Sequence, residues 1–137
     1  MRPIETSNQL QLDFTKLSGM DQDVIPVAVQ DIHTKEVLLI AYTNEEALRE
    51  SLRTRRLVLW STSRRELWRK GEESGNGFRL LEIRVNCEQN SLVYLVEPVN
   101  GGICHTKTAQ GEHRRGCYYR TLDLDTQELQ FNSGTAG

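Results

Sequence analysis

Residues 24–46 read VIPVAVQDIHTKEVLLIAYTNEE. Two apolar runs, at 24–30 and 37–42, flank a short polar segment, and this arrangement is typical of a β-hairpin. The next four residues, Thr43 to Glu46, match a capping box, in which Thr43 is the expected N-cap and a Glu follows three positions later. A helix is therefore predicted from this point to about residue 53, directly after the two strands.

Further strands are predicted downstream of this helix. They cover residues 57–60, an alternating apolar and polar stretch at 81–87, residues 92–96, and a candidate strand at 117–122. Between residues 60 and 77 the chain is polar, basic and rich in glycine, so no element is expected there, and loops of this length often bind ligands. We therefore expect a sheet-rich α+β fold, a single domain with one clear helix.

Length and composition agree with one domain. The 137 residues carry a net charge of −2, with 37% hydrophobic and 26% charged residues, which is typical of a globular chain. We expect an N-terminal extension or edge segment at 1–20, the main domain at 21–125 and a C-terminal tail at 126–137. No signal-peptide core and no apolar run of about 20 residues is found, so we expect a cytoplasmic protein with reduced thiols and no membrane or nucleic-acid partner.

Three cysteines, Cys87, Cys104 and Cys117, cannot all pair within one chain. Their spacing is not Cys-x-x-Cys, so three unrelated buried thiols are one interpretation. However, His105 and His113 lie between the second and third cysteine and enrich that segment in metal-binding atoms. Because catalytic zinc has three protein ligands and structural zinc has four, the cysteines fit either a water-activating zinc or a structural site completed by a histidine.

Cys87 is expected at the end of a strand, where neighbouring side chains point to opposite faces. Asn86 and Glu88 would then point away from Cys87, so that one short segment serves a metal on one side and an oxygen-rich site on the other. The alternative is a polar strand end that enters a turn, which these residue types also favour.

A basic segment with two tryptophans precedes the cysteines. From residue 53 to residue 70 there are seven Lys and Arg and one carboxylate, Glu66, although the whole chain is slightly acidic. Guanidinium groups bind phosphate in a bidentate manner, hydroxyls add donors and Trp stacks on bases, so the segment favours one discrete nucleotide. A solvated basic face is the competing interpretation.

Residues 60–75, WSTSRRELWRKGEESG, together with the downstream cysteines, resemble the phosphoribosyl-AMP cyclohydrolase family of histidine biosynthesis. The family pattern reads Trp-Ser-x-Ser-Arg…Leu-Trp-x-Lys-Gly-Glu-x-Ser-Gly, then Asp-Cys-Asp-x-Asp, then Cys-His-Thr-Gly-x-x-Ser-Cys-Phe. The resemblance extends over about residues 24–120. It implies zinc-dependent hydrolysis of the N1–C6 bond of the adenine ring in phosphoribosyl-AMP, by an intertwined homodimer.

The resemblance also implies metal ligands. It places zinc on three cysteines that are contributed across the homodimer interface: Cys87, Cys104 and Cys117. It places a second metal, magnesium, at the residues that flank the first cysteine: Asn86, Glu88 and Asn90. Zinc lowers the pKa of its water toward about 7 and so supplies hydroxide near neutral pH.

Two further roles are proton transfer and substrate binding. His105, adjacent to a zinc ligand, is the candidate for proton transfer, and an ordinary loop histidine is the alternative. The substrate-binding positions are Trp60, Ser61, Ser63, Arg64, Arg65, Trp68, Arg69, Lys70, Glu72 and Ser74. Each of the two tryptophans would either stack on the purine or belong to the core.

The chain departs from the family pattern in two places. Asn86, Glu88 and Asn90 replace three aspartates, so magnesium should bind weakly there. Twelve residues separate Cys104 from Cys117 where the pattern has six, but the cost of loop closure grows slowly with length, so the two ligands need not be separated. Two alternatives remain: a paralogue for another purine-like nucleotide, and a non-catalytic zinc- or nucleotide-binding domain in which a histidine closes a four-ligand site.

Overall fold

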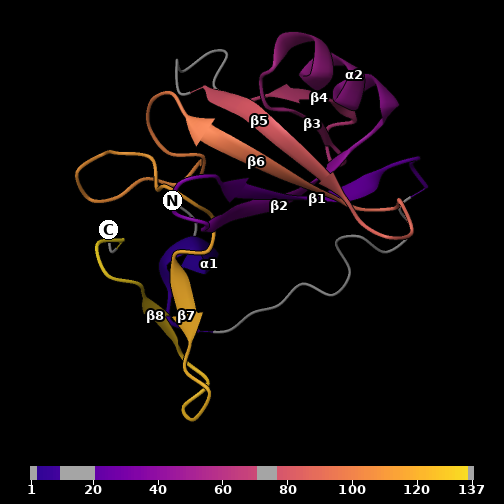
Figure 1. The fold of residues 1–137 in the computed structure, drawn as a ribbon. Coiled ribbons are helices and arrows are strands. Elements are labelled where there is room, and N and C mark those ends of the chain that lie inside the picture. Colours follow the sequence, from indigo (N-terminus) through magenta and orange to yellow (C-terminus); the bar gives the residue numbers. More distant parts are fainter. Residues whose placement is uncertain (1–2, 10–20, 71–76, 136–137) are drawn as a thin grey trace.

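A computed structural model describes residues 3–9, 21–70 and 77–135 (Figure 1). Its main feature is a six-stranded sheet with the strand order β4-β3-β2-β1-β6-β5. In chain order the strands of this sheet are β1 (Ile25–Asp31), β2 (Val37–Thr43), β3 (Val58–Ser61), β4 (Glu66–Arg69), β5 (Phe78–Val85) and β6 (Leu92–Pro98). The fold is therefore sheet-rich α+β, as predicted.

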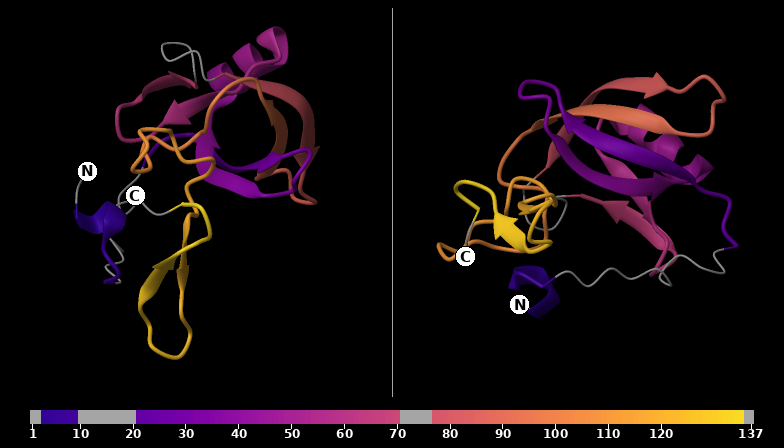
Figure 2. Two further views of the ribbon diagram at one scale, coloured as in Figure 1. Left: turned by 90° about the vertical axis from the view of Figure 1, so that its left-hand side faces the viewer. Right: turned by 90° about the horizontal axis from the view of Figure 1, so that it is seen from below.

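The sheet begins with the predicted hairpin. Strands β1 and β2 pair antiparallel, with Val27 opposite Ala41. Strand β6 then runs parallel to β1 on the other side, and β5 pairs antiparallel with β6. The start of β5 returns to the segment before β3, since the Leu57 N–H donates to the Phe78 carbonyl at 3.1 Å. The sheet consequently curves around a common centre, as Figure 2 shows.

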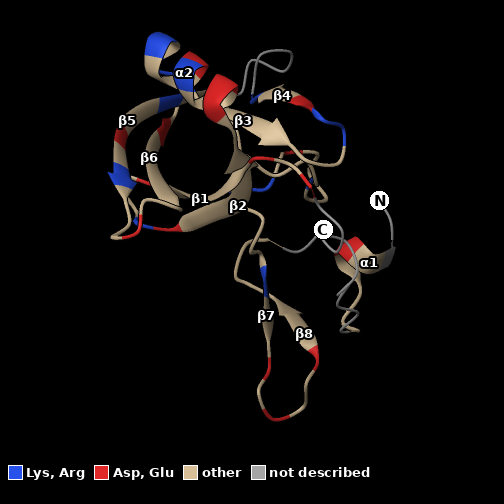
Figure 3. Ribbon diagram, turned by 90° about the vertical axis from the view of Figure 1, so that its right-hand side faces the viewer, with Lys and Arg blue, Asp and Glu red and all other residues tan. Residues whose placement is uncertain are grey.

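Helix α2 (Glu45–Thr54) lies where the sequence predicts it, but its N-cap is Asn44 and not Thr43. The Asn44 side chain accepts a hydrogen bond from the Ala47 N–H at 2.8 Å. Thr43 is the last residue of β2 and pairs with Ile25, so its backbone is committed to the sheet. Acidic residues lie toward the start of α2 and basic residues toward its end, as Figure 3 shows.

Two further predictions are wrong: one missed a strand, and the other placed the end of a strand too late in the chain. The segment at 60–77, expected to lack elements, contains β4, which pairs with β3 so that Trp68 lies opposite Leu59. This strand is only four residues long and shows no alternation in burial, since the adjacent Leu67 and Trp68 are both half-buried. Strand β5 runs from Phe78 to Val85 and thus ends two residues before Cys87.

A second, two-stranded sheet consists of β7 (Arg120–Leu122) and β8 (Leu129–Phe131). The expected strand at 117–122 thus begins only at Arg120. A four-residue helix, α1 (Pro3–Thr6), lies beside these strands, where the Tyr119 hydroxyl donates to the Glu5 carbonyl at 2.6 Å. The expected division at 1–20, 21–125 and 126–137 stays a prediction, although segments from both ends of the chain are in contact here.

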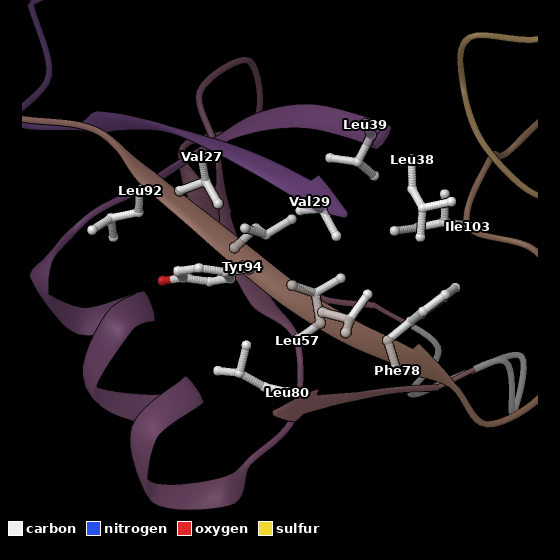
Figure 4. Close-up of a cluster of buried hydrophobic side chains, with 12 residues drawn as sticks. Val27, Val29, Leu38, Leu39, Leu57, Phe78, Leu80, Leu92, Tyr94 and Ile103 are labelled. Carbon is white, nitrogen blue, oxygen red and sulfur yellow. The ribbon is translucent and has the colours of Figure 1, made fainter. Parts of the chain in front are cut away.

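The core lies between the curved sheet, α2 and the segment after β6. Figure 4 shows its cluster of buried residues: Val27, Val29, Leu38, Leu39, Leu57, Leu59, Phe78, Leu80, Leu92, Tyr94, Val96 and Ile103. Each large apolar side chain contributes roughly 1.5–3 kcal/mol when fully buried. Ile103 has a particular role in this cluster, because it attaches the next residue, Cys104, to the core. No helix among the described residues combines the length and the apolar character that crossing a membrane requires.

Candidate functional site

Cys104 and Cys117 are brought into contact. The Cys104 thiol group is buried, and its Sγ accepts a hydrogen bond from the Thr106 N–H at 3.4 Å. A hydrogen bond from the Cys117 thiol outweighs the effect of burial and lowers the pKa of Cys104 to about 5. The same bond raises the pKa of Cys117, whose side chain is exposed. Cys104 is thus the more readily ionised thiol of the pair, and two adjacent sulfur atoms suit a soft metal ion such as zinc.

Lys70 is the cation beside this pair. It follows β4 directly, and its backbone N–H donates to the Leu57 carbonyl at 3.3 Å. Burial lowers the pKa of the Lys70 ammonium, while the negative charge at Cys117 and Cys104 acts in the opposite direction. The end of β4 therefore places a positive charge next to the two sulfur atoms.

The loop between the two cysteines is closely paired with itself. The Cys104 N–H donates to the Arg114 carbonyl at 3.1 Å, and the Arg114 N–H donates to the Thr106 carbonyl at 3.0 Å. At Gly102 an added Cβ would lie 2.2 Å from the Arg114 oxygen, so only glycine allows the two arms to approach. The additional residues extend beyond these paired arms, and the longer loop does not separate the thiols.

An ion pair with a buried carboxylate anchors the same loop to the hairpin. The Arg115 Nη2 lies 2.6 Å from Asp31 Oδ2, and its Nε lies 2.9 Å from Glu36 Oε1. Asp31 is buried at the end of β1, whereas Arg115 is half exposed. Two residues later, the Cys117 N–H donates to the Leu38 carbonyl of β2 at 2.7 Å. The sheet thus fixes the position of the Cys117 backbone.

Cys87 lies in a different setting, exposed in the turn between β5 and β6. Because β5 ends at Val85, the strand alternation expected at Cys87 does not apply. The Asn86 Oδ1 instead accepts hydrogen bonds from the N–H groups of Asn90 at 2.9 Å and Ser91 at 3.0 Å. Among the described residues, no group of three or more His, Cys, Asp and Glu side chains could hold a metal ion. One chain therefore brings together two of the three predicted zinc ligands.

The two histidines of the loop have separate partners. His105 is exposed, and its Nε2 lies 2.9 Å from Glu5 Oε2 of α1. His113 Nδ1 lies 2.9 Å from the Cys104 carbonyl, and because a carbonyl only accepts, this nitrogen is the donor. His113 thus supports the backbone of Cys104, and His105 remains next to the cysteine pair on the outside.

The predicted substrate-binding residues divide into several groups. Trp60 donates through Nε1 to Gln22 Oε1 at 2.7 Å, and Trp68 packs against the core cluster. The residues in and around the turn between β3 and β4 are Ser61, Ser63, Arg64 and Arg65. Of these, Arg65 forms an exposed ion pair with Asp21 at 2.9 Å. Glu72 and Ser74 lie outside the described residues.

Arg69 and Lys70 line a pocket of about 670 Å³. Its other polar and charged lining comes mainly from the end of α2 and the residues after it: Glu50, Arg53, Thr54 and Arg56. Leu57, Val58 and Val99 supply apolar walls, and Gly77 completes the lining. Arg53 and Arg56 belong to the basic segment of the sequence, but no motif singles them out, because only the fold brings them next to Arg69.

Comparison with known proteins identifies the family. Residues 39–119, more than half of the chain, match the family of phosphoribosyl-AMP cyclohydrolases. The chain is 48% identical over 105 residues to the phosphoribosyl-AMP cyclohydrolase of Archaeoglobus fulgidus, covering 77% of this chain and 91% of that protein. It is 46% identical over 112 residues to that of Cenarchaeum symbiosum, covering 82% and 94%.

A longer relative is similar along part of its length. The chain is 42% identical over 123 residues to the histidine biosynthesis bifunctional protein HisIE of Thermus thermophilus, covering 90% of this chain and 54% of that protein. The region matched by the family contains the cysteine pair, Lys70 and most of the curved sheet. The chain therefore belongs to the phosphoribosyl-AMP cyclohydrolase family.

Proposed function

We propose that the chain hydrolyses the N1–C6 bond of the adenine ring of phosphoribosyl-AMP in histidine biosynthesis, and that zinc is required. Family membership supports the reaction. The observation that carries the site assignment is the contact between the Cys104 and Cys117 thiols beside Lys70. Opening an amidine ring needs an activated water and a proton for the departing nitrogen, and both can be provided next to this pair.

The zinc ligands in this proposal come from two chains. Cys104 and Cys117 form a preformed pair of sulfur donors, held by the core and by β2. Cys87 lies outside this pair and is exposed, as a ligand directed at a neighbouring chain has to be, and Cys117 is also exposed and so is accessible to a ligand from another chain. The third ligand is therefore Cys87 of the partner subunit in a homodimer. Bound zinc would supply a water that is activated for attack near neutral pH.

In this proposal, residues of the chain itself transfer the proton and place a positive charge beside the sulfur atoms. Hydrolysis adds the water oxygen to C6 and breaks the N1–C6 bond. Of the two protons of the water, one goes to N1 and the other to the exocyclic nitrogen on C6, which becomes the carboxamide nitrogen. His105 is the proposed proton donor, because it lies beside Cys104 and the Glu5 carboxylate orients its ring at 2.9 Å. Lys70 holds positive charge next to the sulfur atoms and favours their ionised form.

Magnesium has a minor role in this proposal. The side chains of Asn86 and Asn90 are hydrogen-bonded to each other at 2.7 Å and close the turn around Cys87. Glu88 is then the single carboxylate among the three predicted positions. Since magnesium is bound mainly through carboxylates and retained water, the activity should depend only weakly on added magnesium.

Turnover of phosphoribosyl-AMP by zinc-loaded protein, followed by ultraviolet absorbance, tests the proposed reaction. Ring opening that a chelator stops and added zinc restores is the expected result. The variant His105→Gln should retain zinc and lose turnover by about 10²-fold or more. A folded, zinc-loaded protein that does not open the ring would contradict the reaction, and full activity without zinc would contradict the metal.

Mixing two inactive variants tests the shared zinc site. Cys87→Ser and Cys104→Ser homodimers should each lose zinc and activity. After subunit exchange, each heterodimer has one site with all three cysteines. Random exchange gives about half heterodimers, so about a quarter of the wild-type zinc and activity should return. The control mixture, Cys104→Ser with Cys117→Ser, should recover nothing, since every one of its sites lacks a ligand. Equal recovery in both mixtures would contradict the shared site.

A further inference from the structure

The pocket beside Lys70 has a strong local charge. Among the described residues, four cations line it, Arg53, Arg56, Arg69 and Lys70, against one carboxylate, Glu50. The chain as a whole has a net charge of −2, so this excess of positive charge is a property of the pocket and not of the whole surface. Such a concentration of positive charge raises the local concentration of anions and favours their binding.

The Glu50 carboxylate is already paired. Arg69 approaches it with two nitrogens, and the Arg69 Nη2 donates to Glu50 Oε1 at 2.8 Å. This bidentate pair joins β4 to α2 and forms one wall of the pocket. Arg53 and Arg56 add two further guanidinium groups, and within the described parts of the chain the lining has no second carboxylate to balance them.

The position of Arg56 is defined by its neighbours. Its Nη1 lies 3.2 Å from the position that a Cβ at residue 77 would occupy, so Gly77 leaves room for the guanidinium at the pocket. Arg53 lies in the last turn of α2, on the same helix as Glu50. The two cations therefore come from the helix end and from the segment after it.

Lys70 connects this pocket with the cysteine pair. It belongs to the pocket lining, and its ammonium group also interacts electrostatically with Cys104 and Cys117. The volume of about 670 Å³ falls within the range for small-molecule sites, roughly 300–1,000 Å³. One ligand could thus have an anionic end among the arginines and a reacting end near the two sulfur atoms.

We propose that this pocket binds a phosphate group of the substrate, with Arg53 and Arg56 as specificity-determining residues. The inference rests on the proposed function, since it takes phosphoribosyl-AMP as the ligand. A guanidinium group holds phosphate through two parallel hydrogen bonds, so two such groups in one pocket favour a dianion. Of the four cations that the sequence favours for this role, Arg69 and Lys70 line the pocket, whereas Arg64 and Arg65 lie at the turn between β3 and β4 and do not.

Kinetics with matched variants test the proposal. Arg53→Met and Arg56→Met should each raise the KM for phosphoribosyl-AMP by about 10-fold or more, as expected for a lost charge-assisted hydrogen bond, and leave kcat within about twofold. Arg56→Lys should give an intermediate KM because the charge remains and the fork is lost. The control is Arg49→Met, on the same helix, where the arginine pairs with Glu45 and does not line the pocket. Unchanged KM in both pocket variants would overturn the proposal.

Binding of inorganic phosphate, measured by calorimetry on the zinc-loaded protein, separates this proposal from the proposed function. Wild-type protein and Arg49→Met should bind phosphate, and the two pocket variants should bind it at least about 10-fold more weakly. If phosphate binding changes in this way but no variant opens the ring, the pocket stands and the proposed reaction fails. If phosphate binding changes while KM stays at the wild-type value, the pocket holds a free anion and the assignment to substrate is overturned.

Discussion

The loop from Cys104 to Cys117 and the turn that carries Cys87 differ in how the rest of the chain holds them. The loop is attached to the core through buried Ile103, to β1 through the Asp31–Arg115 ion pair and to β2 through the Cys117 N–H. The turn is exposed, and the side chain of Asn86 holds it through hydrogen bonds to residues of the same turn. The positions of Cys104 and Cys117 are therefore fixed by contacts with the core and the sheet, although the Cys117 side chain is exposed, whereas Cys87 lies in a turn held by its own hydrogen bonds.

The largest effect is expected where the loop is most closely packed, at Gly102. A Cβ there would lie 2.2 Å from the Arg114 carbonyl oxygen and 2.5 Å from that of His113. Because backbone atoms cannot move aside easily, Gly102→Ala should lower the free energy of unfolding by about 3 kcal/mol or more and abolish zinc binding. Urea unfolding and zinc content measure the two effects.

The matched control for this variant is Gly111→Ala, at the tip of the same loop. Gly111 has a φ of +79°, but nothing lies within 4 Å of its Cβ position. Its substitution should cost about 1 kcal/mol of backbone strain and leave zinc bound. Equal stability of the two alanine variants would show that the arms of the loop are not closely paired.

A smaller effect is expected at the anchor of the loop. Arg115→Met leaves the buried Asp31 carboxylate without its guanidinium partner and should lower stability by about 2 kcal/mol. Zinc should bind more weakly, because Cys117 lies two residues away and loses its support. The exposed pair of Arg49 and Glu45 provides the comparison, since Arg49→Met should change stability by less than about 0.5 kcal/mol.

The same anchor should respond to pH. Burial raises the pKa of Asp31, but hydrogen bonds from the His33 and Thr34 N–H groups, together with the Arg115 charge, outweigh it and lower the pKa below 3.8. The ionised carboxylate therefore stabilises the folded state above this value, and that contribution is lost as the pH falls through the lowered pKa. Asp31→Asn should be less stable than wild type at pH 7, and the difference should shrink below pH 3.8. A constant difference in urea unfolding from pH 7 to acid would exclude this contribution from Asp31.

The contrast between the two regions also explains what the sequence could predict. The hairpin at 24–42 and helix α2 have strong periodicity and are predicted nearly to the residue, apart from the N-cap. The cysteines are marked by residue type, and the family pattern supplies their expected roles. The Asp31–Arg115 pair and the arginine pocket are not predicted, because their members lie far apart in the chain and only the sheet topology joins them. Strand β4 is missed because four residues, with two adjacent apolar side chains that are both half-buried, show no alternating pattern.

The smallest structural effect, and the clearest change in metal binding, is expected in the turn at Cys87. Asn86→Asp combined with Asn90→Asp places two more carboxylates beside Glu88 and should raise the affinity for magnesium at least about 10-fold. Asn86 accepts two backbone hydrogen bonds through an oxygen that aspartate retains, so the turn should persist. The side-chain hydrogen bond between Asn86 and Asn90 becomes a contact between two carboxylates, so the metal-free variant should lose about 1 kcal/mol of stability. Calorimetric titration with magnesium measures the affinity, with Glu45→Gln as an unrelated charge control. An unchanged affinity would mean that three carboxylates in this turn do not suffice, and that magnesium requires a group from outside it, such as a substrate phosphate.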